Sequence, residues 1–173
     1  MTSSDAEPHA EADTGFSPDF QDFIFYLNEQ KVECVLVGGY ALAVHGVVRA
    51  TGDIDFMYRR TKKNVKRLIG AMMQFGAPAN VIDEEALMRA GIVTQFGKPP
   101  QRIDLLNEID GVKFPEVWHG ATTARIDGQQ IRVIGLKELR ANKGATGRKK
   151  DEEDLRQLTA RAARKPPKTP RTP

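Results

Sequence analysis

Two aspartates separated by one residue, Asp53 and Asp55, stand in a segment that alternates between polar and apolar residues. Side chains two residues apart point to the same face of a β-strand, so these two carboxylates are expected to project together. Neighbouring carboxylates repel each other and raise each other's pKa unless a cation lies between them. A hard divalent cation such as Mg²⁺ prefers oxygen ligands. The pair is therefore a candidate ligand set for such an ion.

A third carboxylate, Asp104, stands in a later apolar segment that reads as another strand. If the two strands are neighbours, three acids could hold two ions about 3.5–4 Å apart, which would activate an attacking hydroxyl and stabilise a leaving group. A solvated surface strand explains Asp53 and Asp55 when they are taken alone. The third acid and the glycine turn described next favour a metal site with Asp53, Asp55 and Asp104 as ligands.

Two glycines, Gly38 and Gly39, end the apolar segment that precedes the aspartates. Backbone amides at a strand-to-helix turn can bind phosphate, and glycine allows a ligand to approach closely. A tight turn without a ligand explains the same residues. Arg49 and Thr51 either contact phosphate or hold the loop before the acids, and both readings stay open. His45, at the far end of the following helix, is expected to cap or pack rather than to catalyse.

Apolar periodicity and capping residues predict the elements that would position these side chains. Strands are predicted over 32–37, 53–58, 92–96, 102–107, 121–126 and 130–134, the last two joined by a hairpin turn at 127–128. Helices are predicted from residue 18, over 40–45, from Thr61 to Gly76, and over 83–90, 135–143 and 151–163. Helices interleaved with strands predict an α/β (α+β) fold with a mixed central sheet flanked by helices.

The length of 173 residues corresponds to one domain. We expect a disordered acidic segment over 1–15, a single domain over 16–163 and a flexible basic tail over 164–173. No apolar run approaches the roughly 20 residues of a membrane helix. The single cysteine, Cys34, excludes an internal disulfide and fits a reducing cytoplasm, where it is expected to be buried.

Net charge is only +3, but the basic residues gather toward the C-terminus. They are Lys137, Arg140, Lys143, Arg148, Lys149, Lys150, Arg161, Arg164, Lys165, Lys168 and Arg171. Such asymmetry is typical of proteins with a polyanion partner, and a solvated helix face followed by a tail explains it equally well.

The segments VGGYALAVHG (37–46) and RATGDID (49–55) together resemble the signature of the DNA polymerase β-like nucleotidyltransferase superfamily. The similarity is greatest to small bacterial members, including the toxins of abortive-infection type toxin–antitoxin pairs. Asp104, in the segment IDLL (103–106), falls where that superfamily keeps its third carboxylate. The resemblance is good over 34–58, reasonable around Asp104 and only suggestive after Val133. It implies the polymerase β-like nucleotidyltransferase fold with basic C-terminal helices.

The resemblance also implies roles for residues. Asp53 and Asp55 would be ligands shared by both metal ions, and Asp104 would also activate the acceptor hydroxyl. Gly38 and Gly39 would form the triphosphate-binding turn, where Tyr40 stands in place of the serine that many members carry. Further nucleotide contacts are expected from Thr51 and from the counterparts of C-terminal basic elements, with Lys137 or Lys143 reaching the γ-phosphate: Lys137, Lys143, Arg148 and Lys150.

The implied activity is Mg²⁺-dependent transfer of a nucleoside monophosphate from an NTP to a hydroxyl, with Mn²⁺ as the alternative ion. The acceptor would be a tRNA 3′ end, a protein side chain or a small molecule, and the basic C-terminal region favours a nucleic acid. A toxin of this kind would have an antitoxin as a partner, and no membrane is implied. Two alternatives remain: a non-catalytic nucleotide- or partner-binding module with the same fold, and a protein that binds nucleic acid through its tail alone.

Overall fold

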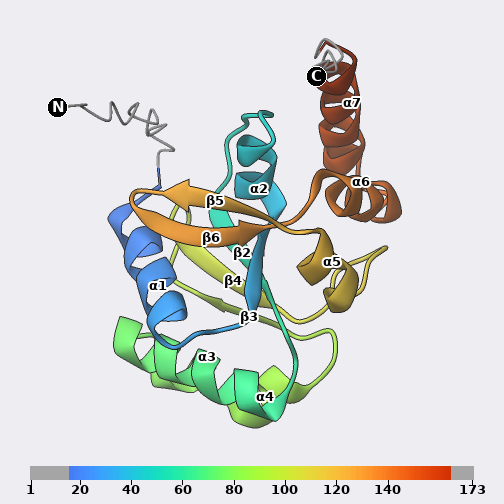
Figure 1. The fold of residues 1–173 in the computed structure, drawn as a ribbon. Coiled ribbons are helices and arrows are strands. Elements are labelled where there is room, and N and C mark those ends of the chain that lie inside the picture. Colours follow the sequence, from blue (N-terminus) through green and yellow to red (C-terminus); the bar gives the residue numbers. More distant parts are fainter. Residues whose placement is uncertain (1–15, 165–173) are drawn as a thin grey trace, which may run out of the picture.

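The computed structural model describes residues 16–164, which form a six-stranded mixed sheet with helices around it (Figure 1). The strand order is β3-β4-β2-β1-β6-β5. The strands are β1 (Cys34–Val37), β2 (Asp53–Tyr58), β3 (Val93–Phe96), β4 (Arg102–Leu106), β5 (Thr122–Ile126) and β6 (Gln129–Val133). β2 runs parallel to β4 and β1 runs parallel to β6, while the other neighbours are antiparallel. The mixed sheet predicted from the sequence is confirmed.

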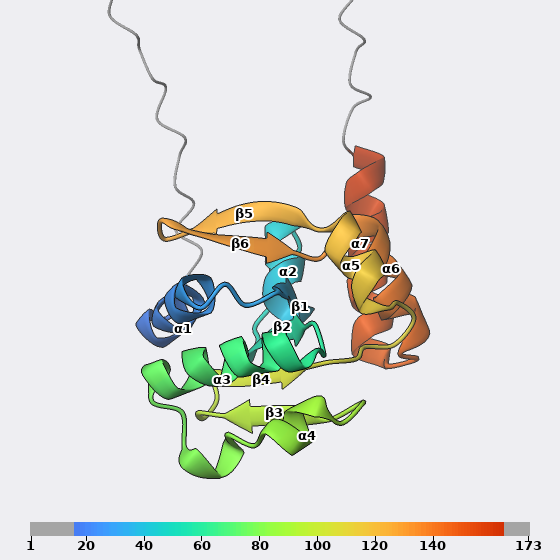
Figure 2. The same cartoon turned by 60° about the horizontal axis from the view of Figure 1, so that its bottom comes forward.

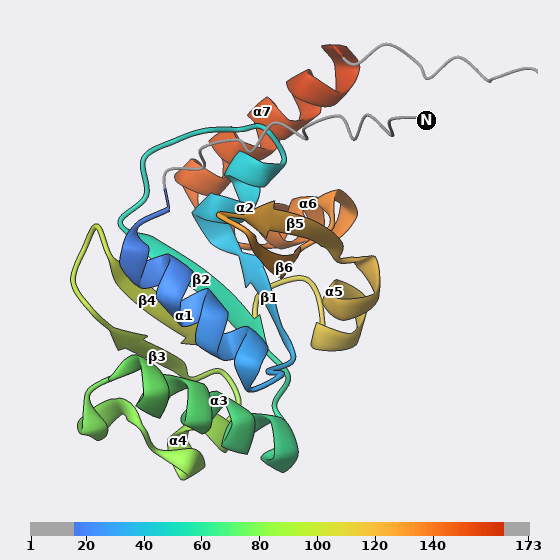
Figure 3. The same ribbon diagram turned by 60° about the vertical axis from the view of Figure 1, so that its left-hand side comes forward.

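The helices form two groups around this sheet. They are α1 (Pro18–Glu29), α2 (Gly38–Val44), α3 (Lys62–Phe75), α4 (Glu84–Met88), α5 (Phe114–Gly120), α6 (Leu136–Ala145) and α7 (Lys149–Arg164), with a 3₁₀ turn at Ala79–Val81. α1 and α3 pack side by side (Figure 2). The pair α6 and α7 lies away from them, next to α5 (Figure 3).

An aromatic cluster joins α1 to one face of the sheet. Phe23 of α1 makes edge-to-face contacts with Phe56 of β2, Phe75 of α3 and Phe96 of β3, at centroid distances of 5.7, 5.1 and 5.5 Å. Such contacts add to the stability that burial of the rings provides. Because Phe56 faces α1, strand alternation turns its neighbour Asp55 to the opposite face. The aromatic cluster thus lies on one side of β2, and the acids lie on the other.

The structure differs from the predicted elements in two places that matter. α2 begins at Gly38 itself, since Gly38 adopts a φ of +67°, which lets the strand pass directly into the helix without a linker. α5 was not predicted because its seven residues, with Pro115 in the first turn, are too few to show helical periodicity. The remaining boundaries shift by at most two residues, and Cys34 is buried as expected.

The predicted disordered segment over 1–15 and all but the first residue of the predicted tail over 164–173 lie outside the described residues. Arg164, where that tail was expected to begin, is the last residue of α7. Within 16–164, every helix is too short or too polar to cross a membrane.

Candidate active site

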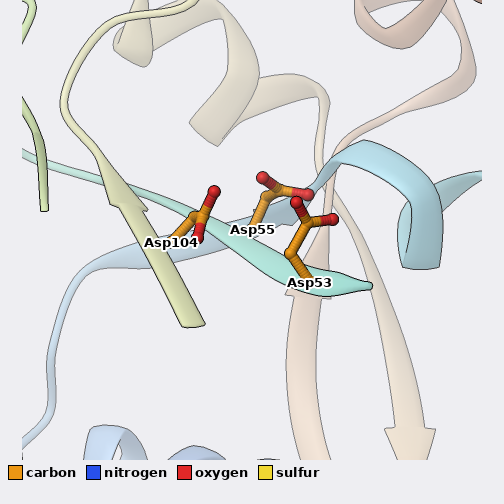
Figure 4. Close-up of side chains that lie close together, drawn as sticks. All are labelled: Asp53, Asp55 and Asp104. Atoms are coloured by element: carbon orange, nitrogen blue, oxygen red, sulfur yellow. The ribbon is translucent and has the colours of Figure 1, made fainter. Parts of the chain in front are cut away.

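The register of β2 and β4 brings the three acids together. In this parallel pair, Asp55 lies opposite Asp104 and Asp53 lies opposite Arg102. All four positions belong to the face of the sheet away from α1. One oxygen of each acid lies within 4.8 Å of the others (Figure 4). The structure therefore assembles the carboxylate cluster that the spacing of the aspartates predicted.

Arg102 supplies a cation between two of these acids. Its Nη2 donates to Asp53 Oδ2 at 2.6 Å and to Asp104 Oδ2 at 3.0 Å, and its Nε donates to Asp104 Oδ1 at 2.7 Å. Gln95 of β3 also donates to Asp104 Oδ2, at 2.9 Å. Sequence reasoning missed Arg102, although it stands two residues before Asp104 and the rule of alternation assigns both to one face.

Asp55 is the acid without a direct partner. Among the described residues, no group donates a hydrogen bond to its carboxylate. Burial, and after it the charges of Asp53 and Asp104, raise the pKa of Asp55 to about 7, while Lys143 and Arg102 act in the opposite direction. The cluster therefore carries negative charge that the protein's own cations balance incompletely.

The backbone of the glycine turn lies directly against the acids. β1 ends with Val37 opposite Asp55, and α2 begins at the next residue. A Cβ added at Gly38 would lie 2.1 Å from Asp55 Oδ2, and one added at Gly39 would lie 2.9 Å from Thr51 Oγ1. Close approach of the backbone to the site is thus the reason for glycine at both positions.

Arg49 and Thr51 both hold the loop before β2. Thr51 Oγ1 donates to Asp53 Oδ1 at 2.9 Å, which orients that carboxylate. Arg49 donates through Nε and Nη2 to the carboxylate of Asp154 in α7, at 2.9 and 3.2 Å. Of the two readings left open by the sequence, the structure thus provides contacts for loop holding, and a phosphate contact of Thr51 stays a prediction.

Lys143 joins the two C-terminal helices through buried ion pairs. It is buried in α6, with Nζ 2.5 Å from Asp151 Oδ1 and 3.1 Å from Asp154 Oδ2. Asp154 is shared with Arg49, so α7 ties together one cation from α6 and one from the loop before β2. Because the charge of Lys143 also acts on the pKa of Asp55, this lysine lies in the electrostatic field of the cluster.

The other basic residues singled out from the sequence are exposed: Lys137 on α6, Arg148 just before α7 and Lys150 in its first turn. In the described part of the chain they form no hydrogen bond or ion pair with the three acids, so their contacts with a nucleotide stay predictions. His45 donates from its ring Nε2 to the carbonyl oxygen of Ile134 at 2.7 Å, a packing role at the end of α2.

The sequence model of one protein family, described as "Nucleotidyl transferase of unknown function (DUF2204)", matches residues 18–168. This match spans most of the chain. The chain belongs to this nucleotidyl transferase family. Membership confirms the polymerase β-like nucleotidyltransferase resemblance found in the sequence. No curated protein sequence matches the chain.

Two solved structures of the antibiotic-resistance factor ANT(2'')-Ia share the fold of this nucleotidyl transferase family member. The solution structure has a TM-score of 0.57 at 14% identity, over 87% of this chain and 86% of that one. The crystal structure, in complex with adenylyl-2''-tobramycin, has a TM-score of 0.53 at 15% identity, over 83% and 87%. At such low identity, the likeness concerns the fold alone.

A nucleotidyl transferase family implies a divalent metal and an NTP, and the acid cluster fits such an ion. Its donors are carboxylate oxygens, the ligands that hard cations prefer. Asp55 lacks a hydrogen-bond donor among the described residues, and the shift of its pKa means that an added positive charge would be favourable there. The donor set and its charge balance are therefore those of a cation site.

Proposed function

We propose that this protein is a divalent-metal-dependent nucleotidyltransferase that transfers a nucleoside monophosphate from an NTP to a hydroxyl group. The observation that carries the proposal is the convergence of Asp53, Asp55 and Asp104 beside the turn at Gly38 and Gly39. Three carboxylates and a closely approaching backbone are what a metal-bound triphosphate requires.

Asp53 and Asp55 would hold the ion, Mg²⁺ or Mn²⁺, with Asp104 as the third ligand. When bound, such an ion supplies charge stabilisation for the reacting phosphate and the departing pyrophosphate. The protein's own contribution is to keep the three carboxylates in place. Thr51 orients Asp53, and Gln95 and Arg102 orient Asp104, so both side chains are fixed before a substrate arrives.

In the reaction, the acceptor oxygen bonds to the α-phosphorus, and the bond from that phosphorus to the bridging oxygen of the β-phosphate breaks. Pyrophosphate leaves, and Asp104 accepts the proton of the hydroxyl. The backbone at Gly38 and Gly39, together with Thr51, would bind the triphosphate. Lys143 would reach the γ-phosphate, since it stands close enough to influence Asp55. Lys137, Arg148 and Lys150 complete the proposed nucleotide contacts.

We assign the acceptor to the nucleic acids. The C-terminal half of α7 carries Arg161 and Arg164 and no acidic residue, and phosphate contacts from such residues supply general affinity for nucleic acids. The bound adenylyl-tobramycin of the ANT(2'')-Ia crystal structure supports a sugar hydroxyl as the kind of group that this fold modifies. A toxin role with an antitoxin partner belongs to the same proposal.

Incubation with each of the four α-labelled NTPs, Mg²⁺ and total RNA tests the activity. Label should enter RNA and pyrophosphate should be released, and Asp53→Asn should reduce both at least about a hundredfold because the charge at the centre of the site is lost. Circular dichroism must show that the variant is folded. Normal transfer by this variant contradicts the proposal. NTP binding in calorimetry without pyrophosphate release would instead indicate a non-catalytic binding module.

A further inference from the structure

We propose that Arg102 is a positioning residue that serves as the built-in counterion of the acid cluster and competes with the divalent metal for Asp53. In the metal-free state its guanidinium links Asp53 to Asp104, and metal loading requires it to release Asp53. The inference rests on the proposed function, because it assumes that Asp53 is a metal ligand.

The hydrogen bonds of Arg102 occupy the space between two of the three acids. Asp53 Oδ2 and both oxygens of Asp104 accept from its guanidinium, at 2.6, 2.7 and 3.0 Å. The remaining oxygen of Asp53, Oδ1, accepts from Thr51. Every carboxylate oxygen of Asp53 and Asp104 thus already has a donor. Because each oxygen has a second lone pair, the obstacle to a metal ion shared by these acids is the positive charge of Arg102 between them rather than a lack of acceptor sites.

The bond to Asp53 is the one most easily released. Arg102 and Asp104 stand on the same strand, two residues apart, and are joined by two hydrogen bonds in the bidentate geometry that makes such pairs strong. Asp53 lies on the neighbouring strand and receives a single bond from the guanidinium. The Arg102 and Asp53 side chains are 29% and 27% exposed, so the guanidinium can move toward solvent and remain hydrated.

The charges point in the same direction. A guanidinium contributes one positive charge to the cluster and a divalent ion contributes two, so both respond to the same carboxylates and each disfavours the other through like-charge repulsion. Arg102 would then lower the affinity for a free ion and keep the acids paired until metal arrives with the substrate. The alternative role predicts the opposite effect on metal affinity. If Arg102 only pre-arranged the acids for the ion, its removal would weaken metal binding.

Binding of Mn²⁺ alone, measured by calorimetry or by the loss of its free EPR signal, separates these roles. The wild type is compared with Arg102→Gln, with Arg102→Lys and with Arg156→Gln, which removes one charge from an exposed arginine that pairs with Glu153 on α7. Arg102→Gln should bind Mn²⁺ about tenfold more tightly, and Arg102→Lys should fall between it and the wild type, because an ammonium keeps the charge without the forked geometry. Arg156→Gln should match the wild type.

Unchanged or weaker Mn²⁺ binding by Arg102→Gln, while wild-type binding still depends on Asp53, overturns this inference and leaves the proposed function standing. If the wild type shows no Asp53-dependent binding, the metal site itself is wrong. Should Arg102→Gln unfold without metal, its melting temperature in Mn²⁺ decides the matter: recovery of the fold by the ion supports the inference. A failure to recover, together with Arg102→Lys binding no tighter than the wild type, overturns it.

Discussion

Asp55 is the residue in the acid cluster whose charge is least balanced. Asp53 and Asp104 both pair with Arg102, whereas Asp55 has no hydrogen-bond donor among the described residues. Burial and the two neighbouring acids raise its pKa from 3.8 to about 7. The folded protein therefore holds a proton on Asp55 at pH values where the unfolded chain has lost it. Stability from this group is full below pH 4 and is lost as the pH rises to about 7.

Replacing this carboxylate by an amide should stabilise the metal-free protein. Asp55→Asn is expected to raise the free energy of unfolding by about 2–4 kcal/mol at pH 8, because ionised Asp55 opposes folding there. The gain should shrink as the pH falls below 7 and disappear near pH 3. Urea unfolding in EDTA at several pH values measures it.

Asp53→Asn is the matched control for this prediction. The same chemical change there removes the charge that pairs with Arg102 and relieves only part of the repulsion on Asp55, so its pH-dependent gain should be clearly smaller. If Asp55→Asn does not raise the free energy of unfolding, or raises it equally at every pH, then ionised Asp55 does not oppose folding and the prediction is wrong.

At the scale of elements, the junction between β1 and α2 decides how closely the backbone can approach the acids. Gly38 has a φ of +67°, and its missing side chain leaves room for the carboxylate of Asp55. Both requirements point to glycine: the left-handed backbone is unfavourable for other residues, and a methyl group would overlap the acid.

Gly38→Ala should therefore destabilise the protein by about 2–4 kcal/mol, the sum of backbone strain and overpacking, and should weaken Mn²⁺ binding by displacing Asp55. Denaturant unfolding and calorimetry measure the two effects. Gly76→Ala is the control, since Gly76 has a φ of +86° but open space where a Cβ would lie. That variant should lose only about 1–2 kcal/mol and keep its metal affinity. Equal losses of unfolding free energy in both variants would mean that the overlap of the added methyl group with Asp55 does not destabilise the protein.

The elements also mark where sequence reasoning succeeds and where it stops. The spacing of Asp53 and Asp55 and the alternation of their strand were sufficient to predict a shared face. The same rule applied to Arg102 and Asp104, but a search for metal ligands passes over an arginine. The helix α5 is too short for a periodic pattern, and the start of α2 at Gly38 depends on a backbone angle that no pattern of residue types encodes.

At the scale of the whole molecule, the site depends on segments that are distant in sequence. β4 lies beside β2 although β3 and two helices separate them along the chain, and periodicity alone cannot predict that neighbour or its parallel register. The expectation that Asp104 joins Asp53 and Asp55 came from its strand-like setting and from the superfamily resemblance. The burial of Lys143 between Asp151 and Asp154 also escaped prediction, because an ion pair between two helices leaves no periodic signal.

That ion-pair network links the C-terminal helices to the loop that precedes the acids. Asp154 of α7 binds both Arg49, in the loop before β2, and Lys143 of α6. The arrangement couples the position of α7 to the loop that leads into the acids. A nucleic acid held by the arginines of α7 would thus be held by a helix anchored to the loop that leads into the acids.

A crystal structure with Mn²⁺ and a non-hydrolysable NTP tests the central claim most directly, because the anomalous signal of the ion locates it without assumptions. We predict an ion about 2.0–2.2 Å from oxygens of Asp53 and Asp55, with the triphosphate beside Gly38 and Gly39 and the guanidinium of Arg102 withdrawn from Asp53. An ion and a nucleotide bound elsewhere, with Asp53 and Asp104 still joined by Arg102, would contradict the account.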